Sequence, residues 1–159
     1  MRFVRFRQRE VGTDNGCAPR ARIPSAPWGP VVVTADEIAD SAALAVRSWR
    51  TVAGPGGEPR VGPMKDGTTR DMIFGVEWLI AFVSEVITME PGDVILTGTP
   101  AGVGVFREPP VFLRPGDVAT VEVEGIGRLS NPIVDADGSV PAGSPAALLL
   151  AGLHRDESR

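Results

Sequence analysis

The chain has 159 residues, of which 43% are hydrophobic and 23% charged, and its formal net charge at pH 7 is −4. This length allows one domain with a hydrophobic core, and the acidic balance argues against nucleic acid as a partner. No apolar run approaches the roughly 20 residues that a transmembrane helix needs, so no membrane span is expected. The 19 glycines and 15 prolines predict many turns and short strands.

The first 27 residues are predicted to form an irregular segment. Residues 2–7 alternate apolar and basic side chains, which favours a short edge strand, and glycines and prolines interrupt the pattern afterwards. The single cysteine, Cys17, lies here without a disulfide partner in the sequence, which makes a reducing cytoplasm the expected compartment. We interpret Cys17 as an incidental thiol rather than a nucleophile, because no base lies near it in the sequence.

Ordered structure is predicted to begin at residue 28. Residues 31–33 are β-branched and suit a buried strand. A capping-box pattern follows them, so a helix over residues 36–47 competes with a strand over residues 43–50, and the strand is slightly favoured. Residues 53–66 are rich in glycine and proline, which predicts a surface loop or a hairpin connection.

The strongest helix signal comes next along the chain. Apolar residues recur at helical spacing between residues 76 and 87, and a proline and a glycine at 91–92 end the pattern. The apolar residues 94–96 then predict a buried strand. Together these signals place one amphipathic helix directly before a short strand.

The last part of the chain is predicted to contain a hairpin and a tail. Residues 118–125 alternate with a period of two, which is typical of a strand with one solvent-exposed face. Residues 128–134 return as its hairpin partner after a glycine-rich turn. From residue 135 to residue 159 the side chains are small and polar, which predicts a flexible tail.

The loop after residues 94–96 concentrates the chemistry of the sequence. Thr97, Gly98 and Thr99 leave the predicted strand and enter a loop that also contains Gly102 and Gly104. Glycines let backbone N–H groups approach a ligand closely, and N–H groups with hydroxyls suit a carboxylate or an oxo group. From spacing alone, a small-molecule site and a tight structural turn stand as equal alternatives.

Several separate motifs in a fixed order resemble the C-terminal domain of the fumarylacetoacetate hydrolase family. The resemblance covers about residues 28–134 and implies an α+β, predominantly β fold, an incomplete mixed β-roll. We therefore predict an irregular N-terminal segment over residues 1–27, a partial catalytic domain over 28–134 and a flexible tail over 135–159. The matching segments are residues 29–38, 69–84, 90–104 and 112–131.

The resemblance also implies a function. The family contains metal-dependent hydrolases, isomerases, hydratases and decarboxylases, so it implies chemistry on a small 2-oxo or acylpyruvate-like acid, in the catabolism of aromatic compounds. It implies Mg²⁺ or Mn²⁺ acting as a Lewis acid, and a homodimer. The family's ligand-seating threonine corresponds to Thr99, with Gly98 and Thr97 beside it as further substrate-binding candidates.

The metal ligands of the family are not found in this sequence. No Glu-x-Glu pair occurs before Gly29, and the neighbourhood of the family's lysine holds Arg20 and Arg22, which cannot lose a proton to act as bases. Catalytic residues therefore stay unassigned. Three hypotheses remain: an enzyme of the family, a truncated inactive relative, and a carboxylate-binding module without turnover.

The other carboxylates are weaker candidates. Glu122 and Glu124 form a Glu-x-Glu pair on one face of a predicted strand, where a solvated face is favoured over a metal pair. Asp66, Asp71 and Glu77 share no spacing that is typical of metal ligands. The two glutamates are therefore expected to be solvated, whereas the other three carboxylates could join a site that their spacing does not define.

The histidine and the tryptophans are not interpreted as binding or catalytic residues. His154 lies in the predicted tail, where a lone histidine is expected to be solvated. Trp28, Trp49 and Trp78 are expected to pack against other side chains rather than to form a stacking platform. None of the four is therefore taken as a site residue.

Overall fold

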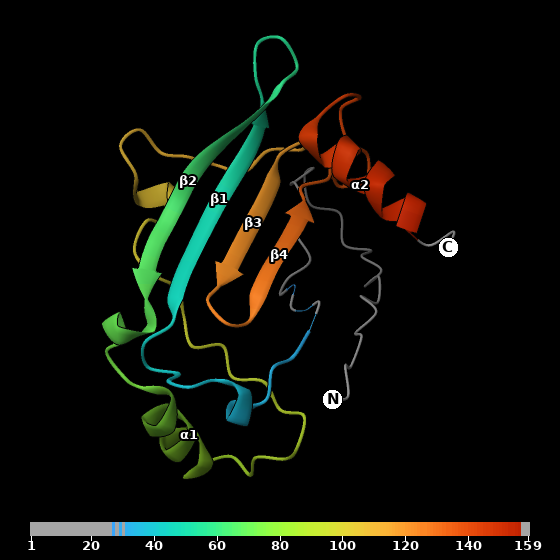
Figure 1. The fold of residues 1–159 in the computed structure, drawn as a ribbon. Coiled ribbons are helices and arrows are strands. Elements are labelled where there is room, and N and C mark those ends of the chain that lie inside the picture. Colours follow the sequence, from blue (N-terminus) through green and yellow to red (C-terminus); the bar gives the residue numbers. More distant parts are fainter. Residues whose placement is uncertain (1–26, 28, 30, 157–159) are drawn as a thin grey trace.

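The computed structural model describes residues 27, 29 and 31–156, and the fold is given for these residues. A four-stranded antiparallel sheet with the strand order β2-β1-β3-β4 forms the centre (Figure 1). The helices α1 and α2 lie near opposite ends of the strands, which confirms the predicted α+β, predominantly β fold. The strands are β1 (Ala45–Ala53), β2 (Pro59–Thr68), β3 (Val118–Val123) and β4 (Gly127–Pro132), and the helices are α1 (Val76–Ser84), α2 (Pro145–Asp156) and the 3-10 turns η1 (Ala35–Glu37), η2 (Thr69–Asp71) and η3 (Gly104–Phe106).

β1 and β2 form a long hairpin. The favoured strand over residues 43–50 is confirmed by β1, and the competing helix shrinks to the single turn η1. The predicted loop over residues 53–66 was wrong beyond residue 58, because the chain from Pro59 onward forms β2. β2 is an edge strand of the described sheet, and edge strands tolerate prolines such as Pro59 and Pro63 because one side of the strand needs no ladder hydrogen bonds.

A β-bulge interrupts this hairpin at Met64. Ser48 pairs with Lys65, but the next residue of β1, Trp49, pairs with Pro63, so Met64 has no partner on β1. Such a bulge disrupts the ladder locally and re-aims the groups beside it. Lys65 consequently shares a sheet face with Ser48, and the main chain of Met64 lies outside the regular pairing.

The predicted hairpin near the C-terminal end is confirmed by β3 and β4. The solvated face expected at Glu122 and Glu124 does not extend to the start of β3. Val118 and Thr120 are buried there, whereas Val121 on the opposite face is 40% exposed. The buried hydroxyl of Thr120 is satisfied, because it shares a hydrogen bond of 2.9 Å with Ser130 Oγ.

Charges of alternating sign cross the whole sheet in one row. Asp66, Arg47, Glu122 and Arg128 lie directly opposite one another on β2, β1, β3 and β4. Ion pairs close both ends of the row, at 3.2 Å between Arg47 and Asp66 and 2.9 Å between Arg128 and Glu122. A slip of one residue would break these opposite-charge pairs, so the row favours the observed register.

The best-buried side chains gather at one end of the sheet, against α2. Ile133 and Ala146 have no exposed area, and Val118 is 7% exposed. The backbone N–H of Gly116 donates to Ile133 O at 2.9 Å, and that of Ala146 donates to Gly116 O at 3.0 Å. The predicted flexible tail was therefore wrong over α2, because the small Ala146 lets the helix start approach the sheet.

The opposite end of the molecule is much more open. The helix predicted over residues 76–87 is confirmed as α1, although it ends at Ser84. The buried strands predicted over residues 31–33 and 94–96 were wrong, since neither segment is a strand and Leu96 is 76% exposed. A strand requires a pairing neighbour, and none of the described strands pairs with either segment.

Asp117 stabilises the closed end of the sheet and gives a testable prediction. Asp117 Oδ2 accepts from Arg50 Nε and from the backbone N–H of Arg114, both at 2.8 Å, and its side chain is only 9% exposed. Asp117→Asn should lower the free energy of unfolding by about 2 kcal/mol, as expected for charge-assisted bonds. Urea denaturation measures the change.

Asp66→Asn is the matched control for that prediction. The carboxylate of Asp66 also accepts from an arginine, but 78% of its side chain is exposed. Its loss should cost less than about 1 kcal/mol, which is typical of exposed ion pairs. Equal effects of the two substitutions would contradict the structural role given to Asp117.

Candidate functional site

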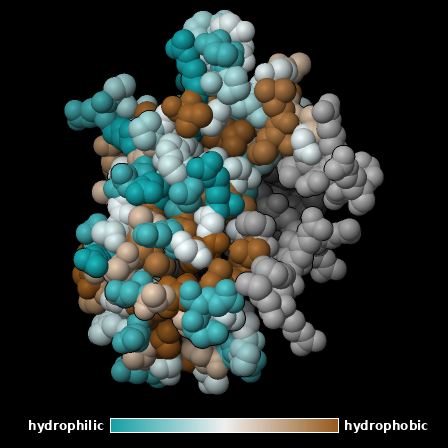
Figure 2. All heavy atoms as spheres, viewed as in Figure 1, coloured by the Kyte–Doolittle hydropathy of each residue, from teal (hydrophilic) through white to brown (hydrophobic). Residues whose placement is uncertain are grey.

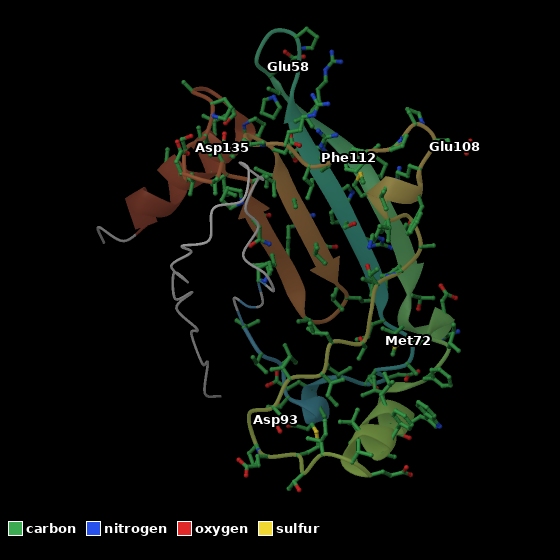
Figure 3. The ribbon with its side chains drawn as sticks, turned by 180° about the vertical axis from the view of Figure 1, so that it is seen from behind. Glu58, Met72, Asp93, Glu108, Phe112 and Asp135 are labelled. Atoms are coloured by element: carbon green, nitrogen blue, oxygen red, sulfur yellow. The ribbon has the colours of Figure 1, made fainter. Side chains whose placement is uncertain are left out.

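The loop with the predicted site residues follows α1 and reaches the edge of the sheet. Figure 3 shows this segment from behind, rising from Asp93 near α1 to Glu108 and Phe112 beside β2. Along this path the chain passes the three substrate-binding candidates Thr97, Gly98 and Thr99. All three residues are exposed, so the loop is open to solvent and to small molecules.

Lys65 is brought to this loop by β2. Its Nζ atom donates a hydrogen bond to Thr99 Oγ1, although 34 residues separate the two in sequence. Gly98 adopts a φ of +101°, a left-handed conformation that glycine reaches without a steric penalty. The structure thus places a cation next to the predicted threonine. Sequence analysis missed Lys65 because it assigned residues 53–66 to a loop.

Arg107 fastens the loop to the bulge in β2. Its Nε atom donates to Gly102 O at 3.3 Å, and its Nη2 atom donates to the carbonyl of Met64. Met64 is the bulged residue, so its carbonyl lies outside the regular pairing with β1. One guanidinium therefore holds both the loop and the strand that carries Lys65.

Close packing of glycines leaves little freedom in this arrangement. A Cβ atom built on Gly102 would lie 2.6 Å from Met64 O, and one built on Gly67 would lie 3.0 Å from Pro100 Cβ. Further along the loop, the Val111 N–H donates to Gly104 O at 2.9 Å. The glycines predicted to approach a ligand serve here to bring the loop backbone against β2.

Partial burial changes the ionisation of Lys65. The cost of desolvating the ammonium lowers the pKa of Lys65 below that of an ordinary lysine. Among the ion pairs that the structure describes, none involves this side chain. Lys65 is also the only lysine in the sequence. That Lys65 is the only lysine can be read from the sequence alone, and this observation could have identified Lys65 as a candidate site residue.

The structure does not gather the carboxylate candidates into a site. Glu122 is paired with Arg128, and Glu124 Oε2 accepts from the backbone N–H of Ala45 at 3.0 Å. Together with Arg47 these glutamates line an open hollow of about 520 Å³ at the turn between β3 and β4. Asp66 is paired with Arg47, Asp71 lies in η2, and Glu77 is exposed in the first turn of α1.

The described residues do not fit a divalent metal ion. In this part of the chain, no group of three His, Cys, Asp or Glu side chains could hold one. Beside Thr99 the structure has the ammonium of Lys65, which would repel a metal ion. The same cation would attract an anionic ligand.

The aromatic candidates have different surroundings. Trp49 lies in β1 with the guanidinium of Arg128 5.1 Å from its ring centroid, a cation–π contact. Trp78 packs only in part, since 47% of it is exposed. His154 falls in α2. Outside the described residues lie Cys17, Arg20, Arg22 and Trp28.

Comparison with known proteins settles the family. A family model described as the C-terminal part of fumarylacetoacetate hydrolase matches residues 4–134, which is most of the chain. The chain belongs to the fumarylacetoacetate hydrolase family. The resemblance found in the sequence motifs is thereby confirmed.

The relatives include a tautomerase and a hydrolase. The chain is 46% identical over 110 residues to a mitochondrial oxaloacetate tautomerase of Xenopus laevis, covering 68% of this chain and 31% of that protein. It also matches a fumarylacetoacetate hydrolase from Exiguobacterium antarcticum, at 42% identity and a TM-score of 0.59, over 68% of this chain and 35% of that one. The chain therefore spans about a third of the length of these relatives.

A further similar structure contains ligands. It is maleylpyruvate hydrolase from Sphingobium sp. SYK-6 in complex with manganese(II) and pyruvate, at 33% identity and a TM-score of 0.53. The match covers 67% of this chain and 34% of that one. Hydrolase and isomerase chemistry thus both occur among the relatives of this family member.

The seating of the loop can be tested at Gly104. A Cβ atom there would overlap the carbonyl oxygen of Val111, so Gly104→Ala should displace the loop and destabilise the fold by about 1–3 kcal/mol, as overpacking does. Urea denaturation measures this loss. Gly75→Ala is the control, because a Cβ atom at Gly75 meets nothing within 4 Å. A Gly104 variant as stable as the control would contradict the packing described.

Proposed function

We propose that this protein binds the carboxylate end of a small 2-oxo or acylpyruvate-like acid at Thr97, Gly98 and Thr99. The hydrogen bond between Lys65 Nζ and Thr99 Oγ1 is the observation that carries the proposal. The reaction served is of the family's hydrolase or isomerase class, in the catabolism of aromatic compounds. The hydrolase with bound pyruvate supports this substrate class, because it is a relative of the chain.

The charges and donors of the site suit a carboxylate. Lys65 supplies an ammonium, and hydrogen bonds between a cation and a carboxylate are stronger than those between neutral groups. Thr99 adds a hydroxyl, which donates as well as accepts. Arg107 also lies close to Lys65. A Cβ atom built on Gly102 would lie 3.4 Å from Arg107 Nη2 and 3.5 Å from Lys65 Cγ. Two basic side chains therefore flank the same part of the loop.

Turnover by the family's route needs Mg²⁺ or Mn²⁺, and manganese is present in a related structure. The described residues do not fit such an ion, because they contain no cluster of carboxylates that could hold one. This observation favours a second candidate function, a cytoplasmic carboxylate-binding module without metal-dependent turnover. The two candidates differ in whether a divalent ion changes the affinity for an oxo acid.

Oxalate, which has the two adjacent oxygen-bearing carbons of a 2-oxo acid, tests the binding by calorimetry. Thr99→Val should weaken oxalate binding about tenfold, the effect of one lost hydrogen bond to a charged group. Binding should also weaken as the pH rises through the lowered pKa of Lys65, because the neutral amine loses its attraction for the anion. The charged groups around this part of β2 include Arg107, whose Nη2 atom lies 3.4 Å from the Cβ position of Gly102, and Asp71, whose Oδ2 atom lies 4.0 Å from the Cβ position of Gly67.

Thr88→Val is the control for this experiment, because Thr88 is an exposed threonine on the segment after α1 and is not one of the proposed binding residues. Equal affinities of the Thr99 and Thr88 variants would contradict the proposed site. An affinity that rises with millimolar Mg²⁺ or Mn²⁺ would support the enzyme, and an unchanged affinity would support the metal-free binding module.

We also infer that the protein forms a homodimer through α1. Trp78 is stacked between Phe74, at 4.2 Å between ring centroids, and Phe82, at 5.0 Å. About half of each of these three side chains is exposed. Figure 2 shows hydrophobic residues reaching the surface in the part of the molecule where α1 lies. An exposed aromatic patch of this kind is typical of a protein–protein interface.

Light scattering tests the dimer. The unchanged chain should elute with the mass of two copies, and Trp78→Glu should shift the population to monomers, because a charge would be buried in the interface. Glu77→Gln alters the neighbouring exposed position and should leave the mass unchanged. A Trp78 variant that stays dimeric would place the interface elsewhere.

A further inference from the structure

Lys65 has the features of a nucleophilic lysine as well as those of a binding residue. It lies on β2 beside the bulge at Met64, where its side chain is partly buried and its Nζ atom contacts the loop through Thr99. In the part of the chain that the structure describes, it takes part in no ion pair with a carboxylate. A lysine that binds an anion does not need partial burial, whereas one that attacks a carbonyl group gains reactivity from it.

We propose that Lys65 forms an imine with the carbonyl carbon of the 2-oxo acid bound at the loop. This inference rests on the proposed function, because the loop must first hold the acid. It goes beyond that function by assigning a covalent step that uses the chain's own amine and requires no metal ion.

The step balances without any further reactant. The neutral amine attacks C2, the C–N bond forms, and the carbonyl oxygen becomes the hydroxyl of a carbinolamine. That hydroxyl then takes a proton and leaves as water. Overall, an ammonium and a ketone give a protonated imine and one water molecule, and two of the three ammonium protons leave with the oxygen.

The surroundings of Lys65 favour each part of this step. Desolvation lowers the pKa of Lys65, so more of the amine is neutral at a given pH. The guanidinium of Arg107 and the side chain of Lys65 both lie beside Gly102. The positive charge of Arg107 can therefore hold the carboxylate of the acid near the amine. The Thr99 hydroxyl, in hydrogen-bond contact with Nζ, is placed to donate to the oxygen that leaves C2.

An imine on Lys65 would allow this site to catalyse reactions at C3 of the bound acid. Its positive nitrogen withdraws electrons from C3, so a proton or a carboxylate on C3 leaves more readily and an enamine forms. Reprotonation of the enamine at C3 and hydrolysis of the imine release the product and regenerate the amine. Loss of carbon dioxide from a 2-oxo acid with a 3-carboxylate, or exchange of a C3 proton with solvent, would follow this course.

Reductive trapping tests the proposal directly. The purified full chain, treated with EDTA, is incubated with pyruvate and sodium cyanoborohydride, which converts an imine into a stable secondary amine. Because Lys65 is the only lysine, mass spectrometry of the intact chain and of its peptides distinguishes Lys65 from the terminal amine without ambiguity. We expect one adduct, on Lys65.

Two controls separate a built site from ordinary amine reactivity. The chain unfolded in urea should label Lys65 at least about tenfold more slowly, because it no longer holds the acid against the amine. Lys65→Arg keeps the positive charge but cannot form an imine, so the adduct should be lost. The position of the adduct on the unchanged chain remains decisive even if this variant fails to fold.

Oxalate binding separates failure of this proposal from failure of the proposed function, because oxalate has no ketone. An adduct on Lys65 that depends on the fold supports the imine. Oxalate binding without an adduct, or labelling confined to the terminal amine, overturns the imine and leaves the proposed function standing. Absence of both oxalate binding and the adduct overturns both.

Discussion

The backbone carbonyl of Met64 is the group on which the candidate site depends. The bulge in β2 removes Met64 from the pairing with β1, and its carbonyl accepts from Arg107, which also holds Gly102 O. If the register set by Trp49 and Pro63 continued without a bulge, Lys65 would pair with Arg47 instead of Ser48 and would point to the opposite face of the sheet. The bulge and the arginine together therefore decide that Lys65 and Thr99 meet.

The charge of the site follows from that arrangement. With Lys65 and Arg107 around the loop, and the carboxylate of Asp66 beside Lys65 in sequence engaged in an ion pair with Arg47, the site suits an anion better than a cation. The structure of a related hydrolase contains both a manganese(II) ion and the anion pyruvate. In the residues described for this chain, which spans about a third of its relatives' length, no cluster of metal-binding carboxylates accompanies the groups that we propose for the organic acid.

Stability and binding are concentrated at different places in the molecule. The buried side chains and the Arg50–Asp117 pair lie where the sheet meets α2. The loop with Thr99 follows α1, where large apolar side chains such as Trp78 are half exposed. Substitutions at Asp117 can thus change folding with little effect on the binding groups, which allows the two properties to be measured separately.

The sequence by itself determined the family, the helix α1, the hairpin of β3 and β4, and the glycine-rich loop, because each of these depends on residues that are near one another in the chain. Only the tertiary structure decided that a proline-rich segment is the edge strand β2 and that its Lys65 contacts Thr99. Composition there resembled a loop, since edge strands tolerate prolines. Pairing with β1 and contact with a loop 34 residues away are long-range events, and no local pattern of residues encodes them.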